Sequence, residues 1–239
     1  LINNTILSLL NNNNNDYKSH FNLSMLSLYV KDAILNVTDL IIFDNGSDEE
    51  TTSWLYKNHP DVFYNGKNDS LASVTTEVFL NSNVEFVGKV DSDIVLPPDW
   101  VERLIAAHQK YHFGFLGGFH FRPEDLNGIE PNIEDYNGVK LWRKHHIGGN
   151  YIIRRVDFKG YKGEGVMGLS EYQAETGLIN GYLWDPILWI EHMEDPRSKY
   201  FIGTEEYNQY KLKTRGVSLE KYASGIVNRA YMMENTNSG

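Results

Sequence analysis

Two aspartates one residue apart, Asp91 and Asp93, end an apolar stretch of the chain and are followed by two prolines. The run before them, residues 84–90, is rich in apolar and β-branched side chains, which is typical of a buried strand. Pro97 and Pro98 suit the end of that strand and the first turn of a helix, because proline fixes φ. The two carboxylates therefore fall in a connection at the carboxyl end of a predicted strand.

This spacing is suited to binding a hard cation. Alternate side chains of an extended segment point to the same side, so Asp91 and Asp93 can converge on Mg²⁺ or Mn²⁺ and leave positions open for phosphate oxygens. The alternative is that both merely solvate a loop. A calcium hand is excluded, because Val95 and Leu96 stand where an oxygen ligand and a glycine are needed. Ligand crevices of open α/β sheets lie at the carboxyl ends of strands, which favours the cation site.

Apolar runs alternate with amphipathic segments along the first half of the chain. The other strands are predicted at residues 5–10, 40–43 and 62–64, and the helices at 21–33, from 48, at 71–78 and after 99. This order predicts an α/β protein of one domain, with a mostly parallel central sheet and helices on both faces. Asp44 ends the second strand, so the crevice rule gives it a ligand role too. Ser47 and Glu50 have the spacing of a capping box.

The second half changes character. Residues 122–139 carry turn residues and no periodicity, and are predicted to form a long functional loop. Tyr182, Trp184 and Trp189 provide either an aromatic platform for a sugar ring or core packing. His108 lies on the apolar stripe of the helix after Asp99, where a core or boundary histidine is expected in place of a ligand.

Composition restricts the possible classes of protein. The chain has 239 residues, 41% of them hydrophobic, which is enough for one sizeable core. Lys and Arg number 22 against 32 Asp and Glu, a formal net charge of −10, so a nucleic-acid partner is not expected. With no cysteine, only oxygen and imidazole ligands can hold a metal. The sequence shows no transmembrane segment and no signal peptide, so a cytoplasmic location is expected.

The order of these elements, with Ile-Ile-Phe-Asp-Asn-Gly-Ser over residues 41–47 and Lys-Val-Asp-Ser-Asp over 89–93, resembles the family 2 glycosyltransferases of the GT-A fold. The resemblance implies a metal-dependent transfer from a nucleotide-diphosphate sugar to a hydroxyl of a glycan, lipid-linked or other acceptor, with inversion at the anomeric carbon. Residues 1–110 would form the nucleotide-sugar-binding half, and 111–239 the acceptor-binding and catalytic-base half. Peripheral contact with a membrane would come only through the acceptor.

The resemblance also implies roles for single residues. The donor would lie across the strand ends with its base near Asn11 and Asp44, and Asp91 would face the ribose. Asp93 would hold the cation on the diphosphate, where the metal acts as a Lewis acid. Asp69, in the Asn- and Asp-rich loop after the third strand, is assigned to donor binding as well.

The catalytic base implied by the resemblance has two candidates. The family often carries an acidic motif after a glycine, and Gly-Thr-Glu-Glu occupies residues 203–206 here. Matching the flanking glycines and Lys211 gives the role to Glu205, whereas matching the acidic pair gives it to Glu206. Many GT-A enzymes have a histidine metal ligand after this motif. None follows Glu206 here, which leaves His192 as a stand-in.

Three other functions remain open. A sugar-1-phosphate nucleotidyltransferase shares the sheet and the metal chemistry, but the chain lacks an early Gly-rich loop followed by Arg and Lys. A glycoside hydrolase would need two carboxylates about 5–10 Å apart across the scissile bond. A non-catalytic module for nucleotide sugars or carbohydrates is expected if the acidic motif near Glu205 is degenerate.

Overall fold

The structure is a computed structural model of the whole chain. It describes residues 4–10, 39–44, 47, 49–58, 63–64, 71–91, 93–120, 122, 126, 130–144, 147–161, 176–193, 195, 197–198, 201, 205, 208–209 and 212–213. None of the helices in these ranges combines the length and the apolar character needed to cross a membrane.

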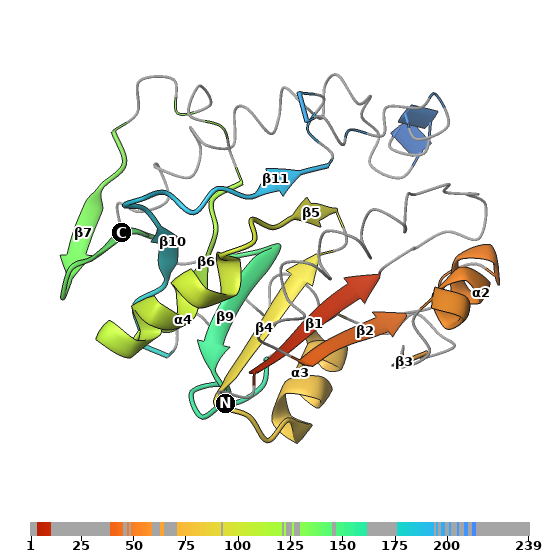
Figure 1. Cartoon of the computed structure of the whole chain (residues 1–239), viewed down its shortest axis with the longest axis horizontal. Coiled ribbons are helices and arrows are strands. Elements are labelled where there is room, and N and C mark those ends of the chain that lie inside the picture. Colours follow the sequence, from red (N-terminus) through yellow and green to blue (C-terminus); the bar gives the residue numbers. More distant parts are fainter. Residues whose placement is uncertain are drawn as a thin grey trace.

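The described strands build one nine-stranded sheet in the order β3-β2-β1-β4-β9-β6-β10-β8-β7 (Figure 1). Their bounds are β1 Asn4–Leu10, β2 Asp39–Asp44, β3 Phe63–Tyr64, β4 Phe86–Asp91, β6 Leu116–Gly117, β7 Ile133–Tyr136, β8 Val139–Arg143, β9 Asn150–Arg154 and β10 Gly181–Leu183. The sheet therefore passes through both halves of the chain.

The first half of the sheet is parallel. Strands β3, β2, β1 and β4 pair in parallel, and the helices α2 (Glu49–Asn58) and α3 (Leu71–Asn81) lie between them in sequence. The helix α4 (Trp100–Lys110) follows the acidic segment. The alternation of strands and helices predicted over residues 39–110 is confirmed, and so is the α/β class. The helix predicted at 21–33 lies outside the described residues.

The second half is mostly antiparallel, so the sheet as a whole is mixed, and its parallel pairing lies mainly in the first four strands. Strand β9 runs antiparallel to β4 and β6, and β8 runs antiparallel to β10 and β7; only β10 and β6 are parallel. Asn137 and Gly138, with φ of 55° and 78°, make the tight turn from β7 to β8. The loop predicted over residues 122–139 is thus wrong for 133–136 and for Val139, which lie in the two strands of a hairpin. Antiparallel strands can be joined by a two-residue turn, so this part of the chain needs no long connection.

Helices cover both faces of the sheet, as predicted. Phe86 and Val90 of β4 point to the face where Leu55 of α2 and Trp100 of α4 are buried. The alternate residue Val87 points to the other face, whose core includes Val74 and Phe79 of α3. This alternation follows from the period of two along a strand, and it fixes which face of β4 each side chain occupies.

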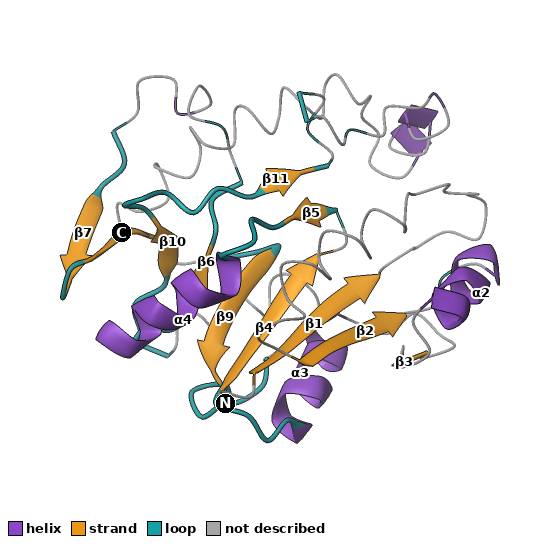
Figure 2. Cartoon of the chain, in the orientation of Figure 1, coloured by secondary structure: helices purple, strands orange, loops and turns teal. Residues whose placement is uncertain are grey.

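A second, two-stranded sheet lies beyond the carboxyl end of β4. Strand β5 (Ile94–Val95) pairs antiparallel with β11 (Glu191–His192), as Figures 1 and 2 show. Because β5 begins directly after the acidic motif, this pairing brings a segment from late in the chain to the strand end that carries the two aspartates.

Candidate active site

Asp91 ends β4 and is held from two directions. Its carboxylate Oδ1 forms an ion pair with the ammonium of Lys89, which precedes it by two residues and so lies on the same side of the strand. The Asp91 backbone N–H donates to the carbonyl of Gly149, at 2.7 Å. The Lys89 side chain is only 9% exposed, whereas the Asp91 side chain is 38% exposed. A buried ammonium therefore anchors a carboxylate that still reaches solvent.

Tyr151 lies beside this pair on the neighbouring strand. It is opposite Lys89 in the β4–β9 register, and its fully buried hydroxyl is hydrogen-bonded to the hydroxyl of Tyr161. Burial raises the pKa of Tyr151 well above its usual value, and the nearby Tyr161 and the charge of Asp91 raise it further. The phenol stays neutral at physiological pH, so the charges beneath the strand end are those of Lys89 and Asp91.

Asp93 is joined to the second sheet. His192 is the register partner of Ile94, and its Nε2 lies 3.6 Å from Asp93 Oδ2. The Met193 backbone N–H donates to the Asp93 carbonyl at 2.7 Å, which fixes β11 against the motif. The ring of His120 lies near by, with its centroid 5.8 Å from that of His192. The histidine that the sequence offered as a stand-in ligand is thus next to the second aspartate.

The donor set around Asp93 fits a divalent cation. A carboxylate and an imidazole are both ligands that Mn²⁺ accepts. Asp91 is a weaker candidate ligand for this cation, because Lys89 already forms an ion pair with one of its carboxylate oxygens. Within the described ranges no three His, Asp or Glu side chains form a complete metal-binding group. The convergence of Asp91 and Asp93 on one cation stays a prediction.

Asp44 stands at the end of β2, as predicted, but its carboxylate serves the start of α2. One oxygen accepts the backbone N–H of Ser47 at 2.9 Å and the other accepts the hydroxyl of Thr52 at 3.0 Å. The residue is 1% exposed. Among the described residues the buried Ser47 hydroxyl has no hydrogen-bond partner, so the capping bond predicted for that side chain is not seen, and Asp44 instead links the backbone before α2 and Thr52 of α2 to the end of β2. Donor binding by Asp44 stays a prediction.

The remaining predicted site residues are less fully described. Asn11, Asp69 and Glu206 lie outside the described residues. Glu205 is helical and exposed, and its Oε1 accepts a hydrogen bond from the side-chain amide of Gln209 at 2.7 Å. The role of this motif as the catalytic base stays a prediction. The choice between Glu205 and Glu206 stays a prediction.

Asn150 is the main residue that the sequence did not reveal. It is fully buried at the start of β9, and its Oδ1 accepts the indole N–H of Trp100 at 2.9 Å and the backbone N–H of Gly118 at 2.7 Å. Its Nδ2 donates to the Gly118 carbonyl at 3.1 Å. One amide therefore ties α4 and the segment leading to His120 to the strand beside Asp91. Lys89 could have been noticed as the one charge between Phe86 and Val90.

Two other predictions concern rings. His108 is a core residue, as predicted: its Nε2–H donates to the Ile152 carbonyl at 3.2 Å, and burial lowers its pKa to about 4. Tyr182 is 1% exposed, so core packing holds for this member of the proposed aromatic platform. Trp184 and Trp189 are partly buried and pack edge-on against Phe119, at 5.3 and 5.5 Å between centroids.

Comparison with known proteins agrees with this geometry. The family described as glycosyl transferase family 2 matches residues 23–164, more than half of the chain. None of the curated protein sequences matches this chain.

Solved structures show the same fold at low identity. The mannosyltransferase PcManGT of Pyrobaculum calidifontis, in complex with GDP-Man and Mn²⁺, is 14% identical with a TM-score of 0.59, over 99% of this chain and 75% of that one. TarS of S. aureus is 13% identical, with a TM-score of 0.52, over 96% and 81%. GalNAc-T7, with UDP, GalNAc and Mn²⁺, is 12% identical, with a TM-score of 0.51. That last match covers 80% of this chain, which spans only 44% of the GalNAc-T7 chain.

Proposed function

The chain belongs to glycosyl transferase family 2, and from this membership we propose that it moves a sugar from a nucleotide-diphosphate donor to an acceptor hydroxyl with the help of Mn²⁺ or Mg²⁺. The observation that carries the proposal is the meeting of Asp93 and His192 beyond the carboxyl end of β4. The GDP-Man and Mn²⁺ bound by PcManGT, and the UDP and Mn²⁺ bound by GalNAc-T7, support this donor class and cation.

The chain's own residues divide the work at the strand end. Asp93 and His192 would hold the cation, which supplies Lewis-acid stabilisation to the departing diphosphate. Two protein ligands leave positions open for substrate oxygens. Asp91, oriented by Lys89 and by the carbonyl of Gly149, faces the donor ribose. Holding the donor in one pose in this way increases the rate, because the entropy cost of orienting the donor is met on binding, before the reaction begins.

The transfer itself needs a base on the acceptor side. Glu205 or Glu206 takes the proton of the acceptor hydroxyl as its oxygen bonds to the anomeric carbon. The bond from that carbon to the diphosphate oxygen breaks, and the electron pair leaves with the diphosphate. Attack from the opposite face inverts the configuration. Residues 1–110, with Asn11, Asp44 and Asp69, form the donor half in this proposal, and 111–239 the acceptor half.

Two alternatives predict different products. A sugar-1-phosphate nucleotidyltransferase would release pyrophosphate from a nucleoside triphosphate, and a binding module would release nothing. The proposed enzyme releases a nucleoside diphosphate from a nucleotide sugar. Release measured across a panel of UDP-, GDP- and other nucleotide sugars, with Mn²⁺ or with a chelator, separates the three.

Variants of the cation site sharpen this test. We expect Asp93→Asn and His192→Gln each to raise the Mn²⁺ concentration for half-maximal nucleotide release by at least about 10- to 100-fold. His112→Gln is a matched control, since His112 pairs with Asp157 at 2.7 Å on the exposed surface. An unchanged Mn²⁺ dependence in both site variants would remove Asp93 and His192 from the cation site.

The same assay addresses the base. Replacing the true base by glutamine should lower kcat by about 10²- to 10⁴-fold while donor affinity is nearly retained. The neighbouring glutamate points about 100° away on a helix, so its variant should keep most of the rate. Normal turnover in both Glu205→Gln and Glu206→Gln would exclude a general base from this motif.

A further inference from the structure

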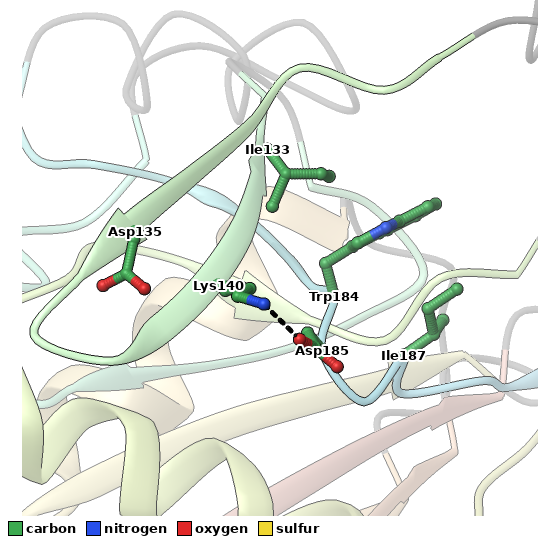
Figure 3. A pocket seen from close by; sticks show the side chains of 6 residues that line it. All are labelled: Ile133, Asp135, Lys140, Trp184, Asp185 and Ile187. Carbon is green, nitrogen blue, oxygen red and sulfur yellow. Dashed lines mark hydrogen bonds and ion pairs between the residues drawn. The ribbon is translucent and has the colours of Figure 1, made fainter.

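A pocket of about 570 Å³ opens on the outer part of the sheet, away from the two aspartates. Its lining comes from the β7–β8 hairpin and the segment after β10, and consists of Ile133, Asp135, Lys140, Trp184, Asp185 and Ile187 (Figure 3). Asp135 is the register partner of Lys140, and the Trp184 backbone N–H donates to the Lys140 carbonyl at 2.9 Å. The three residues therefore form one row across neighbouring strands.

The lining has an apolar side and a charged side. Figure 3 shows Ile133, Trp184 and Ile187 along one side of the pocket. The charged side chains lie along the other, with Lys140 between the two carboxylates, and the Lys140 ammonium is 2.5 Å from Asp185 Oδ2. An indole and two isoleucine side chains thus line one side of the pocket, and three charged groups line the other.

The walls of this pocket are fixed before any ligand arrives. The Trp184 indole packs edge-on against Phe119 and Trp142, at 5.3 and 5.2 Å between ring centroids. The guanidinium of Arg103, on α4, donates to the carbonyl of Pro186 and, at 3.4 Å, to that of Ile187. On the hairpin, Asp135 Oδ1 accepts the N–H of Gly138 at 2.7 Å. A preformed wall lowers the entropy cost of binding.

The charges select the class of ligand. Two carboxylates against one ammonium leave this lining with a net negative charge, and Asp185 already neutralises Lys140. A phosphate or nucleotide would therefore be repelled. A sugar ring suits the pocket, because its C–H face can lie on an indole while its hydroxyls donate to carboxylates and accept from an ammonium.

We propose that this pocket, the Trp184 pocket, binds a sugar unit of an oligosaccharide acceptor at a distance from the point of transfer. The proposal rests on the proposed glycosyl transfer and names its acceptor class. The pocket connects to the cation site through the Trp184–Phe119 contact and through His120, the next residue, whose ring lies beside that of His192. The pocket lies at β7, β8 and the end of β10, and even β10 is three strand spacings from β4, so the two sites are at least about 14 Å apart across the sheet. A ligand that reaches both must be a chain of sugars.

The direct test is binding of fluorescently labelled oligosaccharides of two to six units, on an array and then in solution, without donor. We expect the wild-type protein to bind a subset of them, and Trp184→Ala to weaken that binding on the order of tenfold, as for removal of an aromatic anchor. Trp184→Phe should restore part of it, because a flat ring remains. Tyr56→Ala is the matched control, since Tyr56 is an aromatic residue 48% exposed on α2.

A kinetic arm links the pocket to the reaction. For an acceptor found in this way, Trp184→Ala should raise the acceptor KM for the longest chain more than for a disaccharide. The polar side is tested by Asp185→Asn and Lys140→Met, which should also weaken oligosaccharide binding, while thermal melting checks that the fold is kept.

The proposal is overturned if no oligosaccharide of the panel binds, if Trp184→Ala binds like the wild type, or if the pocket takes free UDP or GDP in place of sugar. Failure of the proposed function looks different. In that case the wild-type protein releases no nucleotide from any nucleotide sugar, whatever its oligosaccharide binding.

Discussion

Replacing Asn150 by alanine should damage both the stability of the fold and the geometry of the site. The side-chain amide makes three hydrogen bonds in a fully buried position, to the Trp100 indole and to the N–H and carbonyl of Gly118. Asn150→Ala leaves two buried donors without an acceptor, and each such group costs about 1–3 kcal/mol. We therefore expect the free energy of unfolding to fall by about 3–5 kcal/mol, a large part of the 5–15 kcal/mol typical of a domain.

The effect of Asn150→Ala on activity should follow from the positions of its hydrogen-bond partners close to the strand end. Gly118 is two residues before His120, and Asn150 is the register partner of Val90, next to Asp91. We expect kcat for nucleotide release to fall together with stability. Asn180→Ala is the matched control, because Asn180 is equally buried and accepts the Phe115 N–H at 2.7 Å, away from the strand end. It should lower stability with little change in kcat.

Urea denaturation followed by tryptophan fluorescence gives the stability, and steady-state nucleotide release gives kcat. If Asn150→Ala does not fold, Asn150→Asp keeps an acceptor for both donors and should be the milder variant. A loss of stability below about 1 kcal/mol, or an equal kinetic effect of Asn180→Ala, would refute the reasoning.

Two further predictions concern buried charges. Lys89→Met removes the cation beside Asp91, and because that carboxylate is partly exposed we expect kcat/KM to fall about tenfold. Lys89→Arg keeps the charge and should retain more of kcat/KM. Equal losses in the two variants would contradict a charge effect. Burial lowers the pKa of His108 from 6.5 to about 4. Between these two pH values His108 therefore binds a proton in the unfolded chain but not in the folded chain. The free energy of unfolding should therefore drop by about 2–3 kcal/mol between pH 7 and 4.5. His108→Gln should show a shallower drop in urea denaturation, and an unchanged slope would rule out this residue as the cause.

The sequence was most informative where local patterns decide the structure. Apolar runs of strand length and stripes with the helical period gave β2, β4, α2, α3 and α4 close to their observed bounds. The position of the acidic pair followed from the same patterns, since a strand that ends in carboxylates delivers them to the sheet edge. These features depend on neighbours within one element, so one sequence suffices to predict them.

The rest depends on contacts between distant segments. The pairing of β5 with β11 involves two residues from each strand, too few for any period to show. Together with the Met193 hydrogen bond to the Asp93 carbonyl, this pairing brings His192 to Asp93. The hairpin over residues 133–143 was hidden for a different reason, since β7 is an edge strand whose acidic residues, the half-buried Glu134 and the exposed Asp135, resemble a loop. The burial of Asn150 comes from three elements meeting at one point, which no local pattern encodes.

The two aspartates of the motif belong to different parts of the architecture. Asp91 is fixed by the main sheet, through Lys89 on its own strand and the carbonyl of Gly149 before β9. Asp93 is fixed by the small sheet, through Met193 and the neighbouring His192. A chain cut after residue 110 would lose β9 and β11 together, and with them the partner of the Asp91 backbone N–H, Gly149, and the partners of Asp93, Met193 and His192. The proposed donor and acceptor halves share one sheet, and the backbone of Asp91 and both the backbone and the side chain of Asp93 contact residues beyond position 110.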